Sequence, residues 1–275
     1  ENILYPVSKM TLRAVEEHVW PERDLFDAIV SFFFQSIYFA VETEKWWLVD
    51  IIYSSLVGLY KKSIEDSMIA LLTFLYGLGV TMHRRQDTDQ AKKFYSVARK
   101  ILQEICRPDF DLIELCILSN ITYGQARIAA SSRNHTAALS TYQASLTHYQ
   151  QAIASNPASA SALQRDLALI QLGLADAHMG LQDWPAAEQA LAKSVAIFRQ
   201  LAAVPRAPRH AREDLAIALA RQALLPPGDL APLQEAEDLL QQLCAEFVEV
   251  PAYPRELNAV RELQSLVAVP SCYAD

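Results

Sequence analysis

Apolar residues recur at the spacing of an α-helix along most of the chain. In residues 22–41, for example, Phe26, Ile29, Phe33 and Ile37 stand three or four positions apart. This spacing places apolar side chains on one helix face. The pattern predicts an all-α protein with helices near residues 22–41, 46–60, 63–85, 88–106, 109–132, 135–154, 158–180, 184–203, 208–225, 231–248 and 253–267.

The segments between these helices are short and carry helix-breaking residues. They read RPD at 107–109, SNPAS at 155–159, VPRAP at 204–208 and PPGD at 226–229. Proline, glycine, asparagine and aspartate are typical of turns. We therefore expect consecutive helices to fold back on one another as antiparallel pairs.

The helices repeat with a nearly constant period. Gly173 follows Gly124 by 49 positions (173 − 124), and the same offset leads from Ala138 to Ala187 and on to Ala236. It also aligns Tyr142 with Leu191 and Ser145 with Ser194. An earlier unit, 47 positions before Ala138, begins its second helix with Ala91. Self-similarity at a fixed offset is the signature of stacked structural repeats.

The repeated positions resemble the tetratricopeptide repeat family. That family has a Leu-Gly pair in its first helix and alanine, an aromatic residue and alanine along its second. The matching sets are Leu78, Gly79, Ala91, Tyr95 and Ala98; Tyr123, Gly124, Ala138, Tyr142 and Ser145; Leu172, Gly173, Gly180, Ala187, Leu191 and Ser194; and, in a degenerate fourth unit, Ala236, Leu240 and Leu243. The offset exceeds the ~34 residues usual in the family, as in extended bacterial arrays attached to signalling or effector domains.

The resemblance implies a right-handed superhelix, or α-solenoid, of antiparallel helix pairs. Helix axes ~8–10 Å apart require small side chains where they cross. The residues expected to permit this packing are Gly79, Ala91, Ala98, Gly124, Ala138, Ser145, Gly173, Gly180, Ala187, Ser194 and Ala236.

Three regions follow from this plan. Residues 1–62 are rich in aromatic side chains and are expected to cap the array or dock on it. Residues 63–250 form the repeats, divided at about 63–107, 108–155, 156–205 and 206–250. Residues 251–275 supply a C-terminal capping helix and a tail.

Composition excludes several classes of protein. The hydrophobic content of 52% is too high for a disordered chain, and 7 Gly and 13 Pro are too few for the turns of a β-protein. The net charge of −8 argues against nucleic acid as a partner. The most apolar run, 28–41, is shorter than the ~20 residues that a membrane span needs.

The cysteines and the start of the chain bear on its location. The 4 Cys are scattered without a C-x-x-C pair, which favours reduced thiols and a cytoplasmic location. The chain begins with Glu1 and shows no secretory signal. We expect it to be part of a larger bacterial protein.

No pattern of catalytic or metal-binding residues is present in the sequence. The 6 His are far apart, and neither phosphate-binding glycine loops nor nucleophile motifs occur. In VEEHVW at 15–20, adjacent Glu16, Glu17 and His18 would point in different directions on a helix. We predict that the chain is not an enzyme and binds neither a metal nor a cofactor.

The family resemblance implies a groove lined by first helices that binds a protein or peptide. The expected binding residues are Thr73, Tyr76, Val80, His83 and Arg84 in the first unit, Gln125 in the second and His178 in the third. His83 and Arg84 are the best candidates for binding a carboxylate. Other groove positions are mostly apolar, which favours packing between units.

Two further functions remain open. The aromatic N-terminal third, with Phe32 to Phe34 and the pair Trp46 and Trp47, could form a homodimer or dock on another domain of the same polypeptide. Alternatively, an all-α superhelix could enclose a small ligand and act as its receptor or as an enzyme. Converging charged residues in an enclosed pocket would favour that alternative.

Overall fold

The described residues of the computed structural model are 65–105, 112–204 and 207–267, and they form helices and turns without any strand. This confirms the all-α prediction. The bounds are α4 (Glu65–Arg84), α5 (Thr88–Ile105), α6 (Leu112–Ser131), α7 (His135–Ser155), α8 (Gln164–Gly180), α9 (Trp184–Ala202), α10 (Arg209–Ala223), α11 (Leu230–Glu246) and α12 (Ala252–Val267). The expected helices at 22–41 and 46–60, and the region 1–62, lie outside the described residues.

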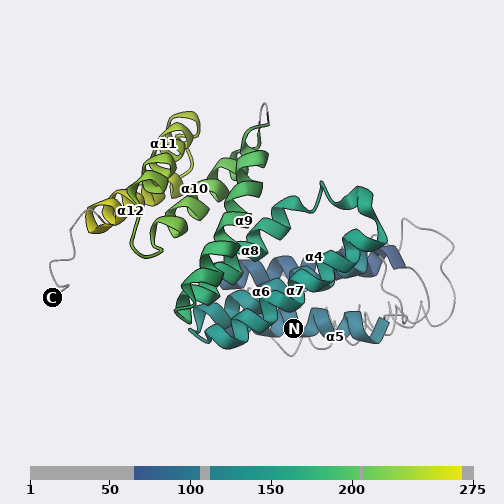
Figure 1. Cartoon of the computed structure of the whole chain (residues 1–275). Coiled ribbons are helices and arrows are strands. Elements are labelled where there is room, and N and C mark those ends of the chain that lie inside the picture. Colours follow the sequence, from purple (N-terminus) through teal and green to yellow (C-terminus); the bar gives the residue numbers. More distant parts are fainter. Residues whose placement is uncertain (1–64, 106–111, 205–206, 268–275) are drawn as a thin grey trace, which may run out of the picture. The chain divides into compact units, whose positions relative to one another are not determined.

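The chain divides into two units, Glu1–Ile117 and Leu118–Asp275. In the first unit α4 packs against α5. In the second unit each helix from α7 to α12 packs against the next one along the chain (Figure 1). Neighbouring helices therefore pack in pairs, as the repeat predicted. The right-handed superhelix stays a prediction.

One helix begins later than its sequence pattern indicated. The prediction started a helix at residue 158, but α8 begins at Gln164, after a short 3₁₀ helix at Pro157–Ser159. Residues 158–163, which were expected to be helical, include Ser159 and Ser161. Serine hydroxyls compete with helical backbone hydrogen bonds, and the Ser159 hydroxyl donates to the backbone carbonyl of Asn156 at 2.6 Å.

The same turn joins the helices of three successive pairs. Its first marker is a residue with positive φ: 65° at Gln86, 55° at Arg133 and 60° at Gln182. The following side chain caps the second helix by accepting a hydrogen bond from a backbone N–H three residues on. These bonds join Asp87 to Gln90 at 3.1 Å, Asn134 to Ala137 at 3.1 Å and Asp183 to Ala186 at 3.4 Å.

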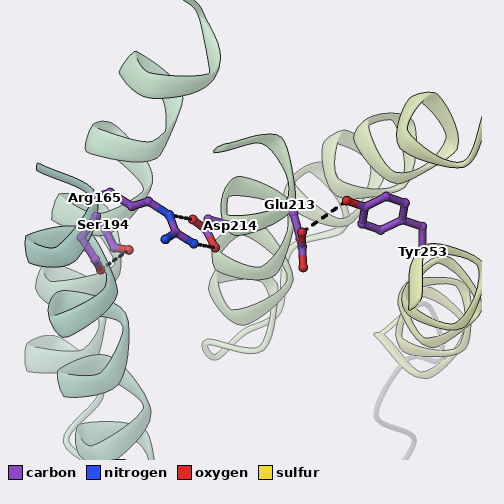
Figure 2. Close-up of polar contacts among 6 residues, drawn as sticks. Arg165, Ser194, Glu213, Asp214 and Tyr253 are labelled. Carbon is purple, nitrogen blue, oxygen red and sulfur yellow. Dashed lines mark hydrogen bonds and ion pairs between the residues drawn. The ribbon is translucent and has the colours of Figure 1, made fainter. Parts of the chain in front are cut away.

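A buried serine links the two helices of a pair in the same way twice. The Ser145 hydroxyl on α7 donates to the Ser119 carbonyl of α6 at 2.9 Å. The Ser194 hydroxyl on α9 donates to the Ala168 carbonyl of α8, also at 2.9 Å (Figure 2). Both bonds span 26 residues and lie 49 positions apart, so the sequence offset corresponds to a repeated register between helices.

The small second-helix residues of the repeat are fully buried. Ala91, Ala98, Ala138, Ser145, Ala187, Ser194 and Ala236 each expose 0% of their surface. Gly79, Gly124 and Gly173 on the first helices are also buried, whereas Gly180 is exposed at the end of α8. A larger side chain at any of the fully buried positions would have to displace a neighbouring helix.

The glycines make room for different neighbours. A Cβ atom on Gly79 would lie 2.5 Å from Cε1 of Tyr95, in the second helix of its own pair. A Cβ on Gly173 would lie 2.5 Å from Cε1 of Tyr142, in the preceding pair. Gly173 was expected to permit packing within its own antiparallel helix pair, but the space beside its Cα is filled by Tyr142 of α7 in the preceding pair. Gly180 likewise accommodates the ring of His135 at the start of α7.

The last helix has one apolar and one polar face. Tyr253, Leu257 and Val260 of α12 are buried, whereas Arg255 and Glu262 are exposed. α12 packs against α11. A polar outer face is the feature that a terminal capping helix needs.

Candidate binding surfaces

The five binding residues expected on α4 lie along one side of that helix. Thr73 and Arg84 are exposed, and Tyr76, Val80 and His83 are half-buried. At the helical rise per residue, these positions span roughly 16 Å. We call this set the α4 stripe.

Contacts within the first unit hold the α4 stripe in place. The ring of Tyr76 packs against the ring of Tyr95 on α5, with 6.0 Å between centroids. Gly77 leaves open space beside the stripe, since a Cβ added there would meet nothing within 4 Å. His83 and Arg84 stand in the last turn of α4, where the helix dipole favours positive charge. The stripe thus combines an anchored aromatic ring with an arginine and a histidine at one end.

The remaining two expected binding residues lie in the second unit, on different helices. Gln125 is half-buried on α6. His178 lies in the last turn of α8, and its Nδ1 atom is 3.2 Å from Oδ2 of Asp183, the residue that caps α9. An acidic side chain of the chain itself therefore already lies against His178.

Three of the five α8 positions that correspond to the α4 stripe are core positions, and the other two, Leu167 and His178, are half-buried. Ile170, Leu174 and Ala177 expose 1%, 6% and 0% of their surfaces. The apolar character of these positions favours packing between units, and the burial of these three side chains agrees with it. In α8 this face serves the contact between helices.

An ion pair that the sequence analysis did not anticipate joins α8 to α10. The Arg165 guanidinium donates from Nε to Oδ2 of Asp214 at 2.6 Å and from Nη2 to Oδ1 at 3.3 Å (Figure 2). Only 9% of the Asp214 side chain is exposed. Two-point contact with a planar guanidinium fixes the orientation of both groups, so this pair aligns the two helices as well as joining them.

A second ion pair between the same helices has the opposite polarity. Here α8 supplies the acid, Asp176, and α10 the base, Arg221, with 3.0 Å between Nε and Oδ1. Burial raises the pKa of Asp176, and Arg221 opposes that shift. Sliding one helix along the other would separate both pairs and bring like charges closer. The two pairs therefore favour a single register of α8 on α10.

The junction between α10 and α12 brings acidic groups together instead. The Tyr253 hydroxyl on α12 donates to Oε2 of Glu213 on α10 at 3.4 Å (Figure 2). Glu256 of α12 lies close enough for the charge of Glu213 to raise its pKa, after the larger effect of burial. Its Oε2 atom is buried without a hydrogen-bond partner.

The sequence contained a signal for these polar junctions. RDLALI at 165–170 resembles EDLAIA at 213–218, with charged residues just ahead of an apolar run in both. Their pairing could not be read from the sequence, because it depends on which first helices become neighbours in the fold.

The described residues contain neither a cluster suited to a metal ion nor a membrane-spanning helix. Within them, no three His, Cys, Asp or Glu side chains are grouped closely enough to hold a metal ion. Cys116 and Cys244 are half-buried. Over the same residues, no helix is long and apolar enough to cross a membrane.

No family model matches the chain, and no curated protein is significantly similar to it. The internal repeat and the surfaces described above are therefore the basis for a functional proposal.

Proposed function

We propose that this chain is a non-enzymatic, protein-binding scaffold of the tetratricopeptide type, acting in the cytoplasm as a regulatory module of a larger bacterial protein. The observation that carries the proposal is the recurrence of one helical hairpin, with the same turn and the same buried serine bond 49 residues apart. Stacked hairpins form extended surfaces that bind partners through area and shape.

The α4 stripe is the proposed binding site. Tyr76, Val80 and His83 are half-buried, whereas their counterparts in α8, Ile170, Leu174 and Ala177, are buried. Thr73 and Arg84, at the two ends of the stripe, are exposed. The half-buried Tyr76 and Val80 offer apolar contact area, and aromatic anchors beside arginine are common in protein interfaces. The partner that fits is a peptide segment with an apolar side chain and, one or two turns away, a carboxylate that binds His83 and Arg84.

The test compares partner capture by three versions of the chain. A His83→Ala/Arg84→Glu variant removes the cationic end of the stripe, and Lys193→Glu makes a matched charge reversal on the exposed face of α9. The immobilised proteins are incubated with lysate of the source organism, and bound proteins are quantified by mass spectrometry. We expect the wild type and Lys193→Glu to retain a common partner that the double variant loses.

A folding control keeps this result interpretable. Circular dichroism melts of all three proteins show whether the variants are folded, since both charge reversals are at exposed positions. Equal recovery of the same partner by the folded double variant would reject the α4 stripe as the binding site.

A further inference from the structure

The contact between α8 and α10 and the contact between α10 and α12 involve the same sequence pattern. The charges that meet are opposite in the first contact and alike in the second. The motif RDL at 165–167 opens α8, EDL at 213–215 lies in α10 and REL at 255–257 lies in α12. Arg165 and Asp214 meet across the first junction. The equivalent residues across the second are Glu213 and Glu256, so a like-charge pair replaces an ion pair.

The charged groups around Glu256 offset its repulsion from Glu213 only in part. Glu213 faces it from α10, and Arg255 on its own helix lowers its pKa, but burial and Glu213 outweigh that effect. The Arg255 Nε atom also donates to the Pro251 carbonyl at 3.0 Å. Tyr253 directs its hydroxyl to Glu213 at 3.4 Å and not to Glu256.

The second half of α12 is held against α11 by favourable polar contacts. The Arg261 Nε atom donates to Oε1 of Glu237 on α11 at 2.8 Å, and the Gln264 amide donates to Oε2 at 2.9 Å. These bonds, with buried Leu257 and Val260, hold the helix against α11. The unfavourable charges are therefore confined to the first turns of α12.

We propose that the start of α12 is a proton-operated latch, which docks firmly when Glu256 is protonated and loosens when Glu213 and Glu256 are both ionised. A neutral Glu256 carries no charge that repels the carboxylate of Glu213, and its burial no longer costs the removal of a charge from water. Loosening exposes the buried ring of Tyr253 and the α10 surface beneath it. The latch does not depend on the proposed binding function.

The direction of the pH effect follows from the raised pKa of Glu256. A group whose pKa is higher in the docked state favours docking when protonated. The latch is therefore fully closed below the ordinary pKa of 4.5 and opens as the pH rises through the raised value.

Hydrogen exchange of the α12 amides, measured by mass spectrometry on the whole chain, tests this proposal. Protection is compared from about pH 5 to about pH 7.5 after correction for intrinsic exchange rates. We expect wild-type protection at the start of α12 to fall several-fold over this range. Glu256→Gln should stay protected throughout, and Glu213→Arg, which recreates the arrangement of Arg165 and Asp214, should be more protected than wild type at the higher pH.

The exposed residue Glu262 provides the matched control. Glu262→Gln removes a charge from the same helix and should follow the wild-type profile, while α9 peptides report on global unfolding. If Glu256→Gln does not fold, Glu213→Gln removes the same repulsion from the α10 side and should weaken the pH dependence, leaving the part that comes from the burial of Glu256. A pH-independent wild-type profile, or a Glu256→Gln profile that falls as the wild type does, would overturn the latch.

Discussion

The first helices α4 and α8 place equivalent positions in different environments. When the two are aligned on Gly79 and Gly173, Val80 corresponds to Leu174 and Arg84 to His178. Val80 is half-buried and Arg84 exposed, whereas Leu174 exposes only 6% of its surface. In its unit α8 packs against α7, α9 and α10. The repeat therefore determines which residues share a helix face. The helices packed around it determine whether that face is buried or exposed.

The largest expected difference is between acidic substitutions at the aligned apolar positions. Leu174→Asp would bury an unpaired charge and should lower the free energy of unfolding by ~3–5 kcal/mol. Val80→Asp, whose carboxylate can reach water, should cost ~1 kcal/mol or less. Urea unfolding followed by circular dichroism measures both. Equal losses would mean that the two faces do not differ as described.

Glycine-to-alanine substitutions on the two helices should change the stability of the protein in opposite directions. Gly173→Ala forces a methyl group against the ring of Tyr142 and should destabilise the protein by ~1–3 kcal/mol. Gly77→Ala on α4 meets open space and should stabilise it by up to ~1 kcal/mol, because alanine favours helix. Thermal melts of the two variants provide the test, and stabilisation by Gly173→Ala would contradict the close approach of α7 and α8.

The smallest expected effect concerns a polar residue of α8. Burial raises the pKa of Asp166 above 3.8, although Tyr149 and Arg165 partly oppose the shift. The stability that comes from protonating Asp166 is present below 3.8 and is lost as the pH rises through the raised pKa. Wild type should therefore lose stability relative to Asp166→Asn over that window. Unfolding at a series of pH values measures the difference, and a constant difference would count against the shift.

Much of the helical framework could be predicted from the sequence, because it depends on local periodicity and on turn residues. The helix at 184–203 was placed within one residue of α9, Trp184–Ala202. The start of α8 was missed, since residues 158–163 contain alanine and leucine, which favour helix, while their serines and Pro157 favour a turn.

The contacts between helices were much less accessible to prediction. The small size of Gly173 indicated a close approach, but only the fold shows that the neighbour is Tyr142. The link between Arg165 and Asp214 likewise joins residues 49 positions apart on two first helices. On α4, the sequence identified the stripe through a family resemblance, and the surface exposure of each residue had to come from the structure.

Close packing of neighbouring helices depends on the small side chains of the second helices. This dependence is tested most directly by measuring the free energy of unfolding of Ala187→Glu and Lys193→Glu, two charge changes on α9 at a fully buried and an exposed position. We predict a loss of ~3–5 kcal/mol for Ala187→Glu and less than ~0.5 kcal/mol for Lys193→Glu. An Ala187→Glu variant as stable as Lys193→Glu would contradict the packing described here.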